Sequence, residues 1–278
     1  MKFYKYHGLG NDYIVIDSEE TGGKLSESQI RKICHRNFGV GSDGILFGPL
    51  ETNEGDFGLR IFNPDGSEAE KSGNGLRIFS RYLLDIGRVG TEVFSIFTKG
   101  GVVNSRVHEG GQIVTVEMGK VRFDSRIIPV EGPAREVLNE TVHVDKEELV
   151  FCAATVGNPH CIILREKALA EEAKKWGPKI EVDPRFPNKT NVQFMEIIDR
   201  SNIRIEIWER GAGYTLASGS SSTAAGAVAY RLGLCEKEIN VHMPGGEIAL
   251  IIDDDFSIIM TGPVAKIAEG IFADELFD

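Results

Sequence analysis

The strongest constraint on how this chain can fold is an internal repeat with a spacing of 146 residues. Segment 71–87, a Ser-Gly step followed by a helix-like run, matches segment 217–233 when 146 is added to each number. The strand-like segment 59–63 falls in the same way on 205–209, and both stretches end in a polar residue. Matches in one order at one spacing indicate a duplicated structural unit.

The repeat extends beyond these two segments. A Gly-Asn step at 10–11 precedes an apolar run, as the Gly-Asn step at 157–158 does 147 positions later. The pattern therefore predicts the same order in each copy. A Gly-Asn turn is followed by a strand, a further strand that ends in a polar residue, a helix of roughly 13 to 15 residues, and β-rich sequence. We expect a mixed α/β (α+β) chain whose first half ends near Gly119. The second helix should be buried all round, because 222–229 is nearly all small residues.

Composition excludes several classes of protein. The 278 residues, 41% of them hydrophobic, can form one large or two ordinary domains. No apolar run approaches the roughly 18 residues of a membrane span. The net charge of −11 disfavours binding to a phosphate backbone, so we expect neither a nucleic-acid nor a membrane partner. The start MKFYKYHGLGND lacks the apolar core of a secretory signal, so we expect a cytoplasmic protein.

The sequence has no convincing signature of a metal or cofactor site. Its four cysteines include no C-x-x-C pair, and we expect each of them to be a small buried apolar residue: Cys34, Cys152, Cys161 and Cys235. A G-x-G-x-x-G match at 39–44 follows helix-like sequence and precedes strand-like sequence, the reverse of a dinucleotide fingerprint. We therefore expect neither a metal nor a cofactor.

The paired helix starts are the best candidate functional feature. Ser72 and Ser218 each precede a glycine and a helix-like run, so both are candidate N-caps, and ordinary capping alone would explain either one. Two helix N-termini that face each other could hold an anion such as an α-carboxylate on their free N–H groups. A side chain at each start would then address opposite faces of one carbon, as inversion by proton transfer requires.

Six short motifs along the chain are recognisable in order. They are His7-Gly8-Leu9-Gly10-Asn11-Asp12, Asn63-Pro64-Asp65-Gly66-Ser67-Glu68-Ala69-Glu70, Gly73-Asn74-Gly75-Leu76-Arg77, Gly157-Asn158-Pro159-His160, Thr190-Asn191-Val192 and Glu209-Arg210-Gly211-Ala212-Gly213. In this order they resemble the diaminopimelate epimerase family over essentially the whole chain.

The resemblance implies a fold and an activity. It implies two pseudo-symmetric halves, 1–118 joined by a returning segment 264–278, and 119–263, each a β-sheet wrapped around a central helix, with the active site in the cleft between them. Ser72 and Ser218 would face that cleft. The implied activity is epimerisation of a small-molecule amino acid without pyridoxal phosphate, in lysine and peptidoglycan biosynthesis. The implied assembly is a homodimer.

Site residues carry over one position at a time. Those matched to the substrate's distal end are Asn11, Asn63, Asn158, Asn191, Glu209 and Arg210. Those matched to its reacting end are Gly73, Asn74, Gly219 and Ser220, with His160 and Glu209 matched to residues that assist the catalytic pair. From the residues alone, Asn11 and Asn158 could equally be turn residues, and Arg210 could form a surface ion pair.

The chain departs from the family at the catalytic pair itself. The family's two bases are cysteines, and both positions are serine here, Ser72 and Ser218. A helix N-terminus can make a thiol of pKa near 8.5 a usable thiolate. An alcohol needs an adjacent general base, and the candidates are His160 and Glu209. With an ordinary imidazole pKa of about 6.5, activity would fall as His160 is protonated below that pH.

Three hypotheses follow. The first is a serine-based epimerase that inverts the α-carbon of LL-diaminopimelate to the meso form. The second is a cofactor-independent racemase or dehydratase acting on another amino acid. The third is a weak or inactive amino-acid-binding homologue. Deliberate replacement of two cysteines would leave their neighbours unchanged, yet 220–222 and Tyr214 also differ from the usual pattern, which favours a natural variant.

Overall fold

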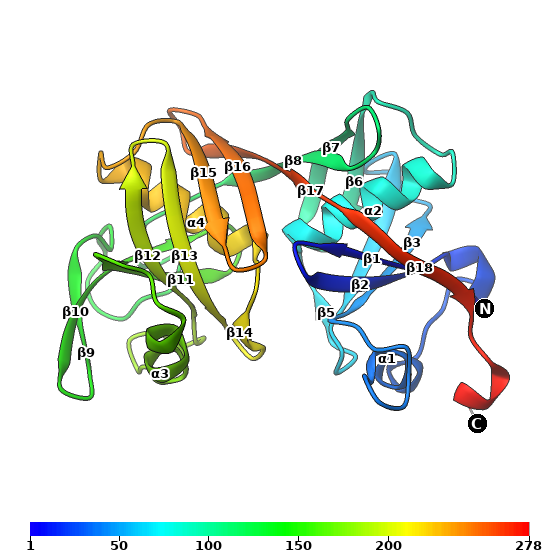
Figure 1. Cartoon of the computed structure of the whole chain (residues 1–278), viewed down its shortest axis with the longest axis horizontal. Coiled ribbons are helices and arrows are strands. Elements are labelled where there is room, and N and C mark those ends of the chain that lie inside the picture. Colours follow the sequence, from blue (N-terminus) through cyan, green and yellow to red (C-terminus); the bar gives the residue numbers. More distant parts are fainter. Residues whose placement is uncertain (278) are drawn as a thin grey trace. The chain divides into compact units, whose positions relative to one another are not determined.

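The computed structural model describes residues 1–277, which form two compact units (Figure 1). Unit 1 comprises Met1–Val116 together with the described residues from Gly262 onward, and unit 2 comprises Glu117–Thr261. The chain leaves unit 1 within β8 (Ile113–Lys120) and re-enters it within β17 (Ser257–Pro263).

Unit 1 is one sheet with two α-helices. Its elements are β1 (Lys2–Gly8), β2 (Asn11–Ile16), η1 (Ser18–Thr21), α1 (Glu27–Cys34), β3 (Ile45–Leu50), β4 (Phe57–Phe62), β5 (Glu68–Ala69), α2 (Gly73–Asp85), β6 (Val93–Thr98), β7 (Gly101–Val107), β8, β18 (Ala265–Ile271) and η2 (Asp274–Leu276). The pairing order is β18-β1-β2-β3-β4-β6-β7-β8, with β5 also on β4. The β2–β3 and β4–β6 pairs are parallel and the others antiparallel.

Unit 2 has the same plan. Its elements are β9 (Glu140–Val144), β10 (Glu147–Thr155), β11 (Pro159–Arg165), α3 (Ala170–Glu181), β12 (Asn191–Asp199), β13 (Asn202–Glu209), β14 (Gly213–Thr215), α4 (Gly219–Arg231), β15 (Glu238–Met243), β16 (Gly246–Ile252) and β17. The pairing order is β9-β10-β11-β12-β13-β15-β16-β17, with β14 also on β13. Here β11–β12 and β13–β15 are the parallel pairs.

Strand by strand, the two orders have the same sequence of parallel and antiparallel pairs. The one change of connection is at the outer edge, where the C-terminal strand β18 pairs with β1 while β9 pairs with β10. The C-terminal strand thus covers in unit 1 the edge that β9 covers in unit 2, since an uncovered edge would expose unpaired backbone groups. The predicted duplication of an α/β unit is confirmed.

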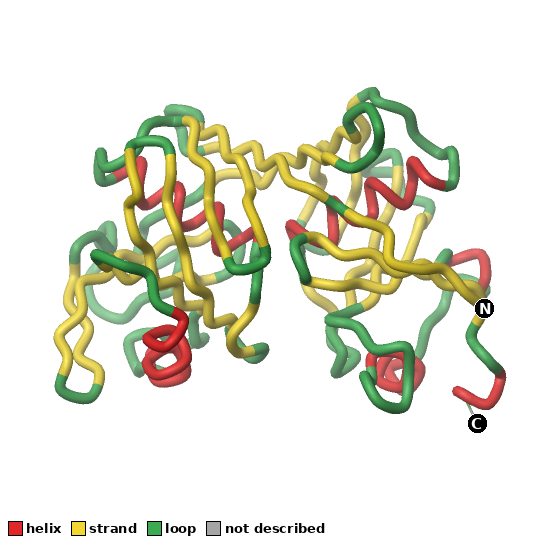
Figure 2. Tube along the Cα trace, in the orientation of Figure 1, coloured by secondary structure: helices red, strands yellow, loops and turns green. Residues whose placement is uncertain are grey.

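One helix of each unit lies inside the curve of its own sheet. Helix α2 contacts the neighbouring strands β1 and β2 and also β7, which lies far from them in the pairing order, so the sheet must bend around the helix. Helix α4 contacts β10, β11, β12, β13, β15 and β16. Figure 2 shows both helices with strands of their own unit on several sides. The segment 222–229 of α4 is fully buried, as its small residues predict.

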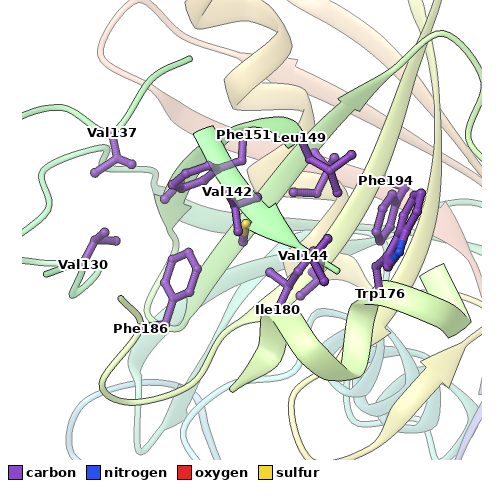
Figure 3. Packing of buried hydrophobic residues seen from close by; sticks show 14 of the residues in the cluster. Val130, Val137, Val142, Val144, Leu149, Phe151, Trp176, Ile180, Phe186 and Phe194 are labelled. Carbon is purple, nitrogen blue, oxygen red and sulfur yellow. The ribbon is translucent and has the colours of Figure 1, made fainter. Parts of the chain in front are cut away.

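The cores pack around these sheets and helices. In unit 2 the aromatic rings of Phe151 and Phe186 meet edge to face, and Trp176 of α3 stacks on Phe194 of β12 (Figure 3). The four cysteines are free and buried, as expected. Among residues 1–277, no helix has the length and apolar character needed to cross a membrane.

Candidate active site

Both predicted N-caps are formed. Ser72 has extended backbone angles and its Oγ accepts a hydrogen bond from Gly75 N, 3.0 Å away, at the start of α2. Ser218 has nearly the same angles and its Oγ accepts from Ser221 N at 3.4 Å, at the start of α4. Each serine hydroxyl is therefore fixed at the positive end of a 13-residue helix.

The first turns of these two helices carry no charge. They read Gly73-Asn74-Gly75 and Gly219-Ser220-Ser221. The peripheral helices differ, because α1 begins at Glu27 and α3 has glutamates in its first turn, which balance the positive end in the ordinary way. The backbone N–H groups and helix dipoles at the starts of α2 and α4 therefore suit a bound carboxylate.

In unit 1 the helix start is tied to the Gly-Asn turn. Asn74 Nδ2 donates to Asn11 Oδ1 at 3.0 Å, and Asn11 Nδ2 donates to Asp43 Oδ2 at 2.9 Å. Ser72 Oγ lies 3.2 Å from the hydroxyl oxygen of Tyr13, on β2. The structure thus links the predicted site residues Asn11 and Asn74, and Tyr13 and Asp43 contact this group through Ser72 and Asn11.

A charged network holds this turn. Arg36 Nη2 donates to Asp12 Oδ1 at 2.8 Å and to Asp43 Oδ1 at 2.6 Å, and Lys5 Nζ lies 2.9 Å from Asp12 Oδ2. Burial raises the pKa of Asp12, but the hydrogen bonds from Arg36 and Lys5 outweigh it and keep the pKa below its ordinary value. Asp12 is therefore an anchored carboxylate.

Asn63 forms hydrogen bonds within its own turn. It follows β4 in an exposed turn, where its Nδ2 donates to Ser67 Oγ at 2.9 Å and its backbone N donates to Ser67 O at 2.8 Å. Its side chain bonds within its own turn, which is the turn role that an Asn-Pro-Asp-Gly sequence favours.

In unit 2 the predicted polar residues gather at the starts of β11 and β12. His160 pairs with Asn191 across these parallel strands, and His160 Nε2 is 3.0 Å from Asn158 Oδ1. Asn191 Nδ2 donates to Pro159 O at 2.9 Å, and Asn191 Oδ1 accepts from the backbone N of Arg210 at 2.9 Å. The side chain of Asn191 therefore joins the two loops that carry the other predicted residues.

Arg210 and Glu209 occupy the end of β13 and the turn after it. The Arg210 guanidinium is exposed and donates to Asn188 O at 2.9 Å, a backbone acceptor rather than the surface carboxylate considered from the sequence. Glu209 is the last residue of β13 and is half-buried, and its backbone O accepts from Ala212 N at 3.1 Å. This turn follows directly from the strand that pairs with β12.

His160 is fully buried, with 0% of its surface exposed. Burial is the main reason that its pKa falls to about 3, and the nearby positive charge of Arg210 lowers it further, whereas Gln193 acts in the opposite direction. The expectation of protonation near pH 6.5 is therefore wrong. The imidazole is neutral at ordinary pH, and while it stays this buried it holds an added proton only weakly.

The serine run of the second helix start has divided roles. Ser221 Oγ accepts from Gln193 Nε2 at 2.9 Å, and Ser222 Oγ donates to Ser218 O at 2.8 Å, so both hydroxyls are used inside the unit. Ser220 is half-buried, with its Oγ 3.4 Å from that of Ser218. Ser220 is therefore the member of the run whose side chain is partly exposed beside Ser218.

No group of three or more His, Cys, Asp and Glu side chains within residues 1–277 is placed to hold a metal ion. Tyr13 and Asp43 were missed by sequence reasoning. The signal for Tyr13 was present, because the repeat aligns it with His160, whereas nothing in the sequence pattern marks Asp43. That Ser72 and Ser218 face one cleft stays a prediction.

Replacing Asn191 by alanine is expected to destabilise unit 2 by roughly 1–3 kcal/mol, because the buried Pro159 O and the part-buried Arg210 N lose their partner. Urea unfolding of the variant measures this. Asn188→Ala is the matched control, since the side chain of Asn188 is exposed and its backbone O, which binds Arg210, is retained. Equal unfolding midpoints for the two variants would contradict this role of Asn191.

Comparison with known proteins identifies the family of this chain. The family model described as diaminopimelate epimerase matches residues 3–123 and 152–267. The chain belongs to the diaminopimelate epimerase family. Within that family it is 60% identical over 277 residues to diaminopimelate epimerase 2 of Nostoc sp., covering 100% of this chain and 97% of the relative. It is 36% identical to diaminopimelate epimerase of Moorella thermoacetica, covering 98% and 99% of the two chains.

A solved structure supports the fold of this family member. The probable proline racemase of Agrobacterium radiobacter K84 aligns with a TM-score of 0.74 at 14% identity, covering 100% of this chain and 94% of that one. At that identity the likeness concerns the fold alone.

Proposed function

We propose that this protein is a diaminopimelate epimerase that inverts the α-carbon of LL-diaminopimelate to the meso form by two-base proton transfer. The observation that carries the proposal is the pair of equivalent, uncharged helix starts, each capped by a serine hydroxyl. Family membership across both units supports it. In this proposal Gly73, Asn74, Gly219 and Ser220 bind the reacting end of the substrate.

The proposed chemistry uses one serine on each face of the α-carbon. One Oγ takes the α-proton while its own hydroxyl proton moves to a hydrogen-bond partner, and the other serine supplies a proton to the opposite face. Negative charge that develops at the α-carbon and its carboxylate is stabilised by the N–H groups of the helix starts. His160, as a neutral imidazole, and Glu209 assist in unit 2, as the family resemblance implies.

The substrate's distal end is proposed to bind the polar residues outside the helix starts. These are Asn11, Asn63, Asn158, Asn191, Glu209 and Arg210. The exposed guanidinium of Arg210 suits a carboxylate, and the carboxylate of Glu209 suits an ammonium group, the two charges of an amino-acid end. The hydrogen bond from the backbone N of Arg210 to Asn191 fixes the end of β13 and the turn after it, which carry these two charges.

We also propose the biological setting that the family resemblance implies. The enzyme would be an isomerase of lysine and peptidoglycan biosynthesis, acting in the cytoplasm as a homodimer on a small-molecule amino acid. Family membership is the support for this setting.

The proposal predicts loss of the α-proton signal when LL-diaminopimelate is incubated with the purified protein in heavy water, with the meso form accumulating. Proton NMR follows both changes. Because the pKa of His160 is about 3, the rate should show no step near pH 6.5 from this residue. Tight binding without exchange would replace the proposal with an amino-acid-binding protein. Exchange of a different amino acid in a parallel panel would indicate a racemase or dehydratase.

A further inference from the structure

Ser72 has a hydrogen-bond partner that the family motifs do not include. The hydroxyl oxygen of Tyr13 lies 3.2 Å from Ser72 Oγ, and either atom can be the donor. Tyr13 is on β2, a strand that packs against α2, and only 8% of its surface is exposed. The contact lies wholly within unit 1.

The repeat gives this contact a counterpart. Tyr13 is three residues after Gly10, and His160 is three residues after Gly157. The next residues, Ile14 and Cys161, pair with the parallel strands β3 and β12 in the same way. Tyr13 therefore occupies in unit 1 the place that His160 occupies in unit 2.

Packing fixes the ring of Tyr13. A Cβ atom added to Gly44 would lie 2.7 Å from Cε1 of the ring, so the ring rests directly on the backbone there. Such close packing leaves the ring little freedom to leave Ser72. The ring is thus held against the backbone at Gly44, with its hydroxyl beside Ser72.

The direction of the Tyr13 bond decides what Ser72 can do. A serine hydroxyl has one hydrogen and two lone pairs, and one lone pair of Ser72 already accepts from Gly75 N. When Tyr13 donates to Ser72, the hydrogen of Ser72 is free to be given to substrate. When Ser72 donates to Tyr13, a lone pair of Ser72 is free to take a proton from substrate.

We propose that Tyr13 is a positioning residue that relays a proton to and from Ser72, a role that rests on the proposed function. As Ser72 protonates the α-carbanion, the Ser72 O–H bond breaks and the α-carbon C–H bond forms. Tyr13 then gives its hydroxyl proton to Ser72 Oγ and is left as a phenolate, which regains a proton from water. In the opposite reaction Tyr13 first gives its hydroxyl proton to water, and the phenolate then takes the proton of Ser72 while Ser72 takes the α-proton.

A serine hydroxyl needs a neighbouring group that can take up or supply its proton, and a phenol can do this. A phenol gives up its proton more readily than an alcohol, so the charge ends on a group that can carry it. The equivalent position in unit 2 holds a neutral imidazole, His160, so the two units differ in the side chain at this place.

The first test measures how the Tyr13 hydroxyl affects the side chain at position 72, without any substrate. In Ser72→Cys, iodoacetamide should modify the introduced thiol in preference to the four natural cysteines, which are buried. Adding Tyr13→Phe removes a donor to the thiolate and should raise the thiol pKa by about one unit, which slows alkylation about tenfold below that pKa. Adding Tyr82→Phe instead should change nothing, because Tyr82 donates to Asp17. Equal rates with and without the Tyr13 hydroxyl would overturn the proposal.

The second test measures α-proton exchange separately from LL- and meso-diaminopimelate, and so from each face of the α-carbon. Tyr13→Phe in the natural chain should slow α-proton exchange at least tenfold from one of LL- and meso-diaminopimelate, and leave exchange from the other within about twofold. A merely structural defect would slow both equally, and that result, or no change in either, would refute the relay. If the natural chain exchanges neither isomer, the proposed function fails, while the alkylation rates still decide whether Tyr13 acts on position 72.

Discussion

Replacing Ser72 and Ser218 together by cysteine is expected to raise the rate of α-proton exchange from LL-diaminopimelate by about 10²-fold near pH 8. Both positions cap a helix, and the N–H of Gly75 that now bonds to Ser72 Oγ at 3.0 Å would stabilise a thiolate there. The same stabilisation leaves almost no alkoxide on a serine, because an alcohol starts several pKa units higher. Proton NMR in heavy water measures the rate.

Two sets of variants make this result interpretable. Each single cysteine replacement should gain less than the pair, because inversion needs a competent group on each face of the carbon. The double alanine variant should lose exchange altogether while keeping both helices, since removal of an N-cap costs only about 1 kcal/mol. A folded double cysteine variant with no gain on any amino acid would mean that more than the two bases has diverged.

Much of the fold could be predicted because glycine and serine mark where elements begin. The Ser-Gly steps predicted helix starts at Gly73 and Gly219, and both helices begin there. The repeat predicted two units of one plan because equal spacing of turns and strands requires equal topology. What the repeat could not give was the edge strand β18, since its counterpart β9 comes first in unit 2 rather than last.

The site was predictable as a set of positions but not as a set of contacts. The side chains of Asn11 and Asn74 meet because the Gly-Asn turn lies beside the start of α2 in the folded unit. The bond from Tyr13 to Ser72 depends on how close β2 comes to α2, and periodicity does not encode that distance. Asn63 bonds within its own turn because local side-chain acceptors compete with distant ones.

The protonation state of His160 was the clearest failure of sequence reasoning. From the sequence alone, an imidazole is expected to have its ordinary pKa of about 6.5. The pKa depends instead on the burial of His160 in the folded unit, which leaves none of its surface exposed and lowers the pKa to about 3. Burial is a property of the assembled unit, and it acts on the charged form alone.

This buried histidine predicts a loss of stability in acid with a defined window. The folded chain leaves His160 neutral down to about pH 3, whereas the unfolded chain takes up its proton near pH 6.5. Between these values the unfolded state binds more protons, so the free energy of unfolding falls as pH drops. The contribution is at most about 1.4 kcal/mol per pH unit, or roughly 2–3 kcal/mol between pH 6 and pH 4.

Urea unfolding at pH 6, 5 and 4 measures this slope. His160→Asn should flatten the slope by most of that amount, because asparagine takes up no proton in either state. His143→Asn is the matched control, because it makes the same substitution at an exposed residue of β9. The buried carboxylate of Asp12, whose pKa is held low, loses its contribution only at more acidic pH, as the folded group is protonated. Parallel slopes for His160→Asn and the natural chain would mean that His160 is not held neutral by burial.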